Sequence, residues 1–438
     1  MKPRDLVCNA LTVLVTLAIS FPLAAQDHRS HRYKVINLGT LGGTASNGFG
    51  GPNDRGWVTG DANLTGDQHE HAFLWRRGVM TDLGTLGGPN SSVSFPVKDN
   101  RGLVVGNAQI HKIDPLGEFW GSAYFCTAQN CRGFRNLMLG FSWQRGVMTA
   151  LPTLGGNNGV ATGANNRGQV VGVTETTTHD SNCVPPQVLD FDAVIWGPKP
   201  SQIQTLPVIS GDVAGAAVAI NDRGQVVGAS GTCMVPNSFA FATHAVMWQR
   251  SKLTNLGGLG GAMNNVALAI NNRGQIVGES DLPGDTATHA FFWQNGVMTD
   301  LGTLPGDVVS MANDINNEGQ VVGLSCDASF NCRAFLWERG VMTDLNTLIP
   351  RNSPLYLTFG GGINDRGEIA GSAFDQTTGA SPAFLAVPCK EGNVGAERFC
   401  ERDAATNERP QVMLPENVRK QLQERLRSGL FGTSSSRP

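Results

Sequence analysis

The sequence predicts an all-β protein, a closed seven-bladed β-propeller of four-stranded blades followed by a short C-terminal helical tail. Two observations lead to this prediction: one eight-residue pattern occurs seven times, and four short strand-like segments accompany each copy. A third observation concerns the ends of the array, because a spare copy of one strand precedes the first repeat. Repeats of this length are typical of propellers and solenoids.

The chain begins with a segment typical of a secretory signal peptide. Lys2 and Arg4 precede an apolar run over residues 6–23, and small residues end that run. We expect cleavage after Ala25, which would remove residues 1–25 and leave a secreted or periplasmic protein. An uncleaved anchor is the alternative, although the apolar part is short for a bilayer span. No later stretch could span a membrane, so we expect no other membrane association.

The composition agrees with many short strands and tight turns. Glycine supplies 55 of 438 residues, nearly twice its usual share of about 7%, and charged residues are 16% against about 25%. The formal net charge of −3 gives no electrostatic argument for a nucleic-acid partner.

The repeated pattern reads as a hairpin turn, opened by Asn or Asp and closed by Gly three residues later. In the fifth copy, residues 271–278 read Asn-Asn-Arg-Gly-Gln-Ile-Val-Gly, with apolar residues on both sides. The first side chain can bond the following amides, and Gly suits a left-handed backbone. The copies open at Asn53, Asp99, Asn165, Asn221, Asn271, Asn316 and Asn364. A calcium loop is the alternative, but no second carboxylate recurs at the required spacing, so we expect no metal.

Each repeat supplies four strands in a fixed order. In the fifth repeat these are a strand of small residues (267–270), the strand after the turn (275–278), a strand ending in Trp293, and residues 297–301 after an Asn-Gly turn. Four antiparallel strands every 45 to 66 residues describe a propeller blade, with small residues at the crowded axis.

The tryptophans that end the third strand recur at one repeat position. We expect them to pack between neighbouring blades, with ligand stacking as the alternative. They are Trp75, Trp143, Trp196, Trp248, Trp293 and Trp337. His71, His244 and His289 also share a position, but other residues replace them elsewhere, so we expect blade-edge hydrogen bonding rather than a ring of metal ligands.

Residues 71–88 read His-Ala-Phe-Leu-Trp, then two arginines, then Gly-Val-Met-Thr-Asp-Leu-Gly-Thr-Leu-Gly-Gly. This motif resembles the repeat of the HAF-repeat family of extracellular repeat proteins. The resemblance covers roughly residues 34–388, and copies 2, 3 and 7 depart most from the pattern. It implies an exported repeat fold and brings no activity.

The ends of the array predict how the ring closes. The last repeat ends near Leu385 without its fourth strand, whereas residues 33–43 are a free copy of that strand. We therefore expect the N-terminal strand to complete blade seven, which removes an exposed sheet edge. The propeller would span residues 33–388. An open β-solenoid is the alternative architecture, but it needs no spare strand.

Length variation falls on the connections between second and third strands, on the face opposite the turns. The longest insertion, residues 107–138, carries aromatic and acidic side chains that we expect to contact a partner, an unknown protein or glycan. They are Phe119, Trp120, Tyr124, Phe125, Asp114 and Glu118. The alternative is an insertion that is held by a disulfide and packs on its own blade.

Function is therefore predicted as an exported binding or scaffold module without a cofactor. Propellers also host hydrolases and lyases, but the sequence carries no nucleophile elbow, zinc-protease motif or phosphate loop. The alternative is an extracellular polysaccharide-active hydrolase or lyase that uses Asp114 and Glu118 above the channel.

Eight cysteines remain after the signal peptide, and an even number in an exported chain predicts disulfides rather than a zinc site. Cys126 with Cys131 and Cys326 with Cys332 have four and five residues between them, so we expect local pairs. Cys389 and Cys400 flank the exit of the last blade. Cys183 and Cys233 remain, and in a ring their loops lie on consecutive blades.

Residues 389–438 form a charged tail with one helical pattern. Val418, Leu422, Leu426 and Leu430 recur every four residues, which predicts an amphipathic helix at about 415–430. We expect this face to dock on the propeller or a partner, with membrane-surface binding as the alternative.

Overall fold

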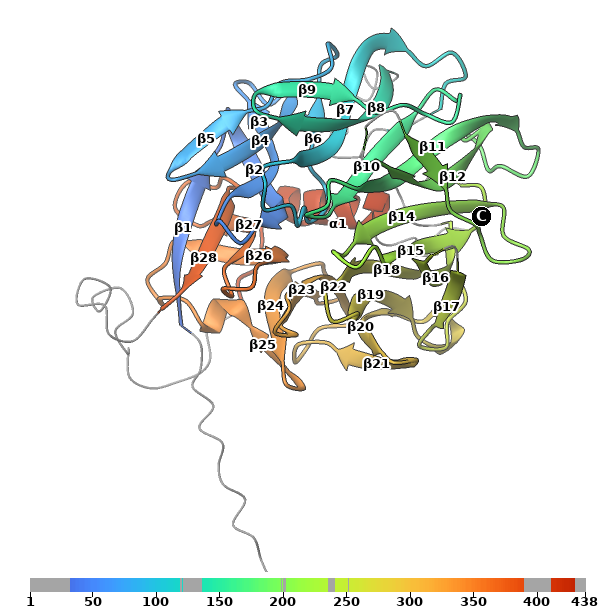
Figure 1. The fold of residues 1–438 in the computed structure, drawn as a ribbon. Coiled ribbons are helices and arrows are strands. Elements are labelled where there is room, and N and C mark those ends of the chain that lie inside the picture. Colours follow the sequence, from blue (N-terminus) through green and yellow to red (C-terminus); the bar gives the residue numbers. More distant parts are fainter. Residues whose placement is uncertain are drawn as a thin grey trace, which may run out of the picture. The chain divides into compact units, whose positions relative to one another are not determined.

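The computed structural model describes residues 32–118, 120, 136–197, 199, 202–234, 241–250, 252–389 and 411–429. In this part the chain forms seven sheets of four antiparallel strands, arranged as a ring (Figure 1). The predicted seven-bladed propeller is confirmed. No helix among these residues combines the length and apolar character needed to cross a bilayer.

Each of blades 1 to 6 starts with its innermost strand and adds the next three toward the rim in chain order. Blades 1 to 3 contain β2 (Gly42–Pro52), β3 (Val58–Leu64), β4 (Glu70–Arg76) and β5 (Val79–Asp82); β6 (Ser91–Ser92), β7 (Val104–Ile113), β8 (Asn136–Gln144) and β9 (Val147–Ala150); and β10 (Gly159–Ala164), β11 (Val170–His179), β12 (Leu189–Trp196) and β13 (Ile203–Thr205). The innermost strand of blade 2 is short, and Pro96, which has no amide hydrogen to donate, lies just after it.

The remaining blades follow the same order. Blades 4 to 6 contain β14 (Ala214–Ile220), β15 (Val226–Gly231), β16 (Ala242–Gln249) and β17 (Lys252–Gly257); β18 (Asn265–Ile270), β19 (Ile276–Asp281), β20 (Thr288–Gln294) and β21 (Val297–Gly302); and β22 (Val309–Ile315), β23 (Val321–Cys326), β24 (Cys332–Glu338) and β25 (Val341–Asp344). Two 3-10 turns, Pro283–Asp285 and Leu345–Thr347, lie in connections.

Blade 7 joins the two ends of the ring. It consists of β26 (Leu355–Ile363), β27 (Ile369–Asp375), β28 (Ala383–Pro388) and β1 (Tyr33–Gly39). β1 pairs antiparallel with β28, with Val35 opposite Ala386. The predicted closure by the N-terminal strand is confirmed, although β1 ends at Gly39 and β2 already starts at Gly42.

The repeated turn has the predicted left-handed glycine. Gly274 has φ 80°, and the side chain of Asn271 accepts hydrogen bonds from the amides of Arg273 and Gln275 at 2.9 and 3.0 Å. The second glycine of the pattern is required for a steric reason, because a Cβ on Gly278 would lie 2.0 Å from the carbonyl oxygen of Val266. Only glycine lets β19 approach β18 this closely.

The tryptophans and histidines take the expected structural places. Trp196 and Trp248 are 1% exposed, and each donates its indole N–H to a proline carbonyl oxygen at the preceding blade linker. His71 and His289 contact Asp82 and Asp300 of the adjacent outer strand at 2.9 and 3.0 Å.

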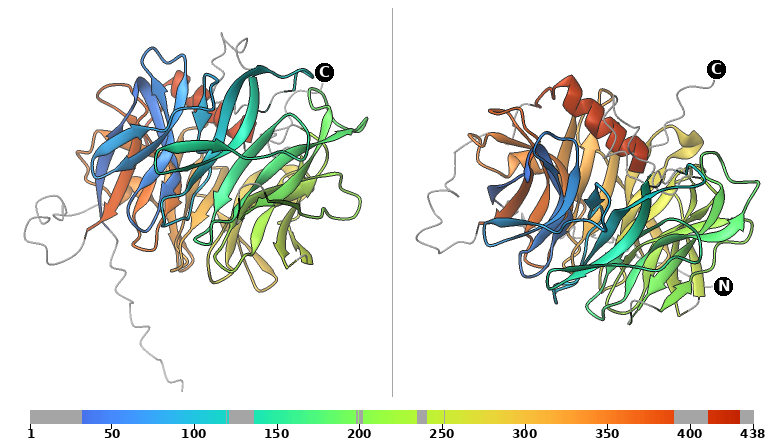
Figure 2. Two further views of the ribbon diagram at one scale, coloured as in Figure 1. Left: turned by 45° about the horizontal axis from the view of Figure 1, so that its top comes forward. Right: turned by 90° about the horizontal axis from the view of Figure 1, so that it is seen from above.

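Apolar side chains fill the axis of the ring at the end opposite the turns. Phe49 and Phe359, from blades 1 and 7, pack edge to face with ring centres 4.7 Å apart. The same cluster includes Leu268 of blade 5 and residues of the C-terminal helix. The helix α1 (Glu416–Gly429) lies across this end of the ring (Figure 2).

Candidate functional site

The described start of the blade 2 insertion is anchored by Asp114. Its Oδ1 accepts hydrogen bonds from the amides of Leu116, Gly117 and Glu118, at 2.7 to 3.3 Å. Its Oδ2 accepts one from the Asn158 side chain of blade 3, at 2.7 Å. Asp114 is buried, so its carboxylate shapes the loop and ties it to the next blade.

Glu118 continues this tie to blade 3. Its Oε1 accepts hydrogen bonds from the main-chain amides of Val188 and Leu189, at 2.8 and 2.7 Å, and from the side chain of Gln187, at 3.1 Å. The side chain is buried. These donors lie at the end of the β11–β12 connection and at the first residue of β12, so the insertion packs on the neighbouring blade.

Trp120 packs inside the protein, against the ring of Phe191 in blade 3. It is 3% exposed, its ring meets that of Phe191 edge to face at 5.9 Å, and its Nε1 donates to Gln187 at 3.2 Å. The other proposed contact residues, Phe119, Tyr124 and Phe125, lie outside the described residues, as do Cys126, Cys131 and Cys400.

Glu175 of β11 lies beside Glu118 and was not singled out from the sequence. Burial and, second, the charge of Glu118 raise the pKa of Glu175 to about 8. Its Oε2 accepts hydrogen bonds from the amides of Asn157 and Asn158, at 3.0 and 2.8 Å. A proton-holding acid next to a carboxylate resembles an acid–base pair. Both residues are buried, however, and the Gln187 side chain donates a hydrogen bond to each carboxylate at 3.1 Å. The only signal in the sequence was a charged residue in the second strand of its repeat, between Thr174 and Thr176.

A disulfide extends the same assembly to blade 4. Cys183 and Cys233 are bonded across 50 residues of sequence, with their Cα atoms 4.4 Å apart. The amide of Val184 also donates to the carbonyl oxygen of Cys233 at 2.7 Å. The predicted pairing is confirmed, as is that of Cys326 with Cys332 in blade 6. Cys389 is disulfide-bonded as well.

The helix α1 covers another part of this loop face. Leu414, just before the helix, and Val418 and Leu422 in it are buried in the axial cluster, four residues apart. The Leu414 amide donates to the Asn331 side chain at 3.0 Å, in the β23–β24 connection. The predicted apolar stripe therefore docks on the propeller at Val418 and Leu422.

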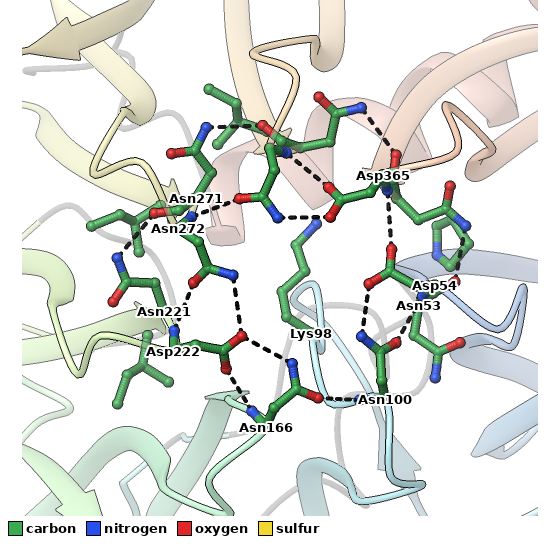
Figure 3. A pocket seen from close by; sticks show the side chains of 17 residues that line it. Asn53, Asp54, Lys98, Asn100, Asn166, Asn221, Asp222, Asn271, Asn272 and Asp365 are labelled. Atoms are coloured by element: carbon green, nitrogen blue, oxygen red, sulfur yellow. Dashed lines mark hydrogen bonds between the residues drawn. The ribbon is translucent and has the colours of Figure 1, made fainter.

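The opposite face carries a ring of hydrogen bonds made by the second residue of each turn. The side-chain oxygen of each accepts the main-chain amide of its neighbour in the preceding blade, at 2.8 to 3.0 Å, and the seven bonds close a circle (Figure 3). Its members are Asp54, Asn100, Asn166, Asp222, Asn272, Asn317 and Asp365. The circle ties every blade to the next.

Lys98 lies inside this circle and reaches across the axis. Its Nζ contacts buried Asp314 of blade 6 at 2.6 Å and donates to the carbonyl oxygen of Ile363 in blade 7 at 2.8 Å. Burial raises the pKa of Asp314, and the Lys98 charge partly offsets that rise. Repeats 4 to 7 have isoleucine at this position, for example Ile270, so the single lysine could have been recognised from the sequence as a departure from the repeat. Among the described residues, no three His, Cys, Asp or Glu side chains gather closely enough to hold a metal ion.

Solved structures that are similar to this chain have very low sequence identity to it. The chain is similar to the β-propeller domain of the Trilobed protease from Pyrococcus furiosus, with 8% identity, a TM-score of 0.44, and 78% of this chain and 92% of that chain covered. It is also similar to a gluconolactonase from Xanthomonas campestris, with 10% identity, a TM-score of 0.34, and 83% and 96% covered. Such values carry no functional argument, and the fold assignment rests on the strand pairing. No protein-family model and no curated protein matches the sequence, so the HAF resemblance stays a prediction.

Proposed function

We propose that the protein is an exported binding or scaffold module of the HAF-repeat type. Its partner, a protein or glycan, would contact the loops of blades 2 to 4. We call the described loop residues 114–118, 120, 180–188 and 232–234 the loop platform. Disulfides suit an oxidising compartment, which supports the predicted export and a secreted or periplasmic location.

The linkage of the loop platform is the observation that carries this proposal. Glu118 of blade 2 binds the blade 3 loop at two main-chain amides, and the Cys183–Cys233 bond joins that loop to blade 4. Ordering long loops costs conformational entropy, and loops that are already fixed lose less of it when a partner binds. The exposed residues at its surface include Ser181, Asn182 and Val184.

The burial of the acidic residues favours binding over hydrolysis. Asp114 and Glu118 accept seven hydrogen bonds from protein groups between them, so neither faces solvent as a catalytic acid or base would need. The hydrolase or lyase alternative is kept as an outcome of the experiment.

The mature chain would be mixed with a panel of soluble polysaccharides, and retention in affinity electrophoresis would be measured together with new reducing ends and unsaturated products. Cell-surface proteins from the same source would be tested by cross-linking. We expect retention or cross-linking without product release. A platform variant, Asn182→Arg with Val184→Arg, should weaken the interaction by about tenfold or more.

Arg223→Ala is the matched control, since Arg223 is exposed on the turn face. Release of oligosaccharides by the wild type would replace the binding function with the enzymatic one. Equal retention of the platform variant and the wild type would remove the loop platform as the contact surface.

A further inference from the structure

The interface between blades 2 and 3 lacks a hydrogen bond that is present at the other six interfaces between neighbouring blades. At those six interfaces, the first Asn of a turn donates its Nδ2–H to the main-chain oxygen at the same position of the next blade, at 2.9 to 3.1 Å. The donors are Asn53, Asn165, Asn221, Asn271, Asn316 and Asn364. Blade 2 has Asp99 instead, which has no amide hydrogen to donate.

A second residue of blade 2 departs from the repeat pattern at the same interface between blades 2 and 3. In blades 3 to 6 a Gln follows the turn glycine and lies over the turn glycine of the next blade. A Cβ on Gly319, for example, would be 3.5 Å from Gln275. Blade 2 has Leu103, and a Cβ on Gly168 would meet nothing within 4 Å. Without a Gln side chain over Gly168, a groove of about 390 Å³ lies between blades 2 and 3.

Asp99 lines this groove with one unused acceptor. Its Oδ1 accepts the amides of Arg101 and Leu103, both at 2.8 Å, as the equivalent Asn oxygens do. Its Oδ2 therefore takes the place of the donating Nδ2. Within the described part of the chain no hydrogen bond reaches Oδ2, although Asp99 is only 2% exposed. The main-chain oxygen of Asn165 lacks the inter-blade donor that its equivalents have and accepts the Gly168 amide within its own turn, at 3.0 Å. Leaving the nearly buried Asp99 Oδ2 without a donor is unfavourable.

We propose that the groove binds the ammonium group of a lysine side chain from an extended peptide partner. The ammonium supplies the donor that Asp99 Oδ2 lacks, at the wall of the groove that Asp99 lines. An arginine fits less well, because a guanidinium binds a carboxylate best through both oxygens and Oδ1 is already occupied. Leu103, Leu151 and Trp196 provide an apolar wall for the aliphatic stem.

The remaining lining suits a peptide main chain. Ser142 and Gln144 border the groove with groups that donate and accept hydrogen bonds, and exposed Arg101 can donate to a carbonyl oxygen of the peptide. This groove opens on the turn face, so it is separate from the loop platform and does not depend on it.

Ligand-observed NMR at low salt with three probes tests this proposal on the mature chain. The probes are the N-acetyl N-methylamides of lysine, of norleucine, which keeps the stem without the charge, and of arginine. We expect the lysine probe to bind at least about tenfold more tightly than the other two, from the strength of a charge-assisted hydrogen bond.

Three variants locate the binding. Asp99→Asn and Leu103→Gln each restore the residue of the other blades, one removing the free carboxylate oxygen and the other filling the groove. Both should fold, and both should lose at least about tenfold in lysine affinity. Glu318→Gln removes the same charge from an exposed turn residue of blade 6 and should bind as the wild type does. Equal binding of lysine and norleucine, retained binding in Asp99→Asn, or no binding of the lysine probe would overturn the proposal. Equal binding of the arginine probe would overturn the choice of an ammonium group.

Discussion

At the scale of the residue, small polar side chains at the turns determine which backbone conformations the chain adopts. Asn271 fixes its turn by accepting two main-chain amides, and Gly274 takes the left-handed conformation that the turn requires. A side chain at Gly274 would find space, since its Cβ would lie 3.6 Å from Gln225. The constraint on this position is therefore conformational rather than steric.

Gly274→Val should destabilise the protein by about 1 to 3 kcal/mol, because a β-branched residue rarely adopts positive φ. Gly274→Asn should cost less, since asparagine tolerates the left-handed region. Urea titrations of the two variants and the wild type check this. Equal stability of the valine variant and the wild type would contradict the role assigned to the turn.

Glu175 makes a pH-dependent contribution to stability. The pKa of Glu175 is about 8 in the folded protein, against 4.5 for a free side chain. Between these values the folded state holds a proton that the unfolded chain has lost, so stability falls as the pH rises through this window. Glu175→Gln should remove this slope and gain about 1 to 3 kcal/mol near pH 8.

Unfolding free energies of the wild type and Glu175→Gln, measured between about pH 4.5 and pH 8, give the comparison. Acids that do not interact with Glu175 titrate equally in both proteins, so the difference between the two curves reports Glu175 together with its coupling to Glu118. Curves that stay parallel across the window would show that Glu175 is ionised in the folded state.

At the scale of the element, the two ends of the chain complete what the seven repeats leave open. β1 supplies the outer strand of blade 7, and α1 covers the loop end of the axis. The amide of Tyr33 also donates to the Leu348 carbonyl oxygen at 2.9 Å, which fixes the start of β1 beside blade 6. Neither element packs against a segment that is its neighbour in the sequence, so both depend on the closed ring for their contacts.

Deleting residues 33–43 should abolish cooperative unfolding or cause aggregation, because β28 then has a free edge. A shorter deletion that ends at Gly39 spares β2 and should behave the same way. Urea unfolding and light scattering measure the loss, and a synthetic peptide of residues 32–41 added in excess should restore part of it. A truncated protein that unfolds like the mature chain would exclude closure by β1.

At the scale of the whole molecule, periodic features could be predicted and long-range ones could not. Strand type, blade number and ring closure follow from a pattern that recurs in every repeat. The partners of Glu118 lie about 70 residues away, and that of Lys98 lies 216 residues away, with no period to reveal them. From the sequence, Asp114 and Glu118 therefore looked available for catalysis, although in the folded ring both are buried and accept hydrogen bonds from protein groups.

The two described disulfides differ in what they join, which gives a prediction about the entire ring. Cys183–Cys233 links consecutive blades across 50 residues, whereas Cys326–Cys332 closes a loop of 6 within one blade. In the chain-entropy model the longer loop stabilises by about 4 kcal/mol and the shorter one by about 2 kcal/mol. Replacing both cysteines by alanine should therefore cost more at 183 and 233 than at 326 and 332.

Urea titrations of the two double variants give the comparison, and hydrogen exchange adds the location of the effect. Loss of the inter-blade bond should raise amide exchange in the connections of both blades 3 and 4, because neither loop is then held by its neighbour. Loss of the local bond should raise exchange in blade 6 alone. A greater loss of stability in the blade 6 variant, or exchange confined to blade 3 in the other, would mean that the long disulfide does not hold adjacent blades together.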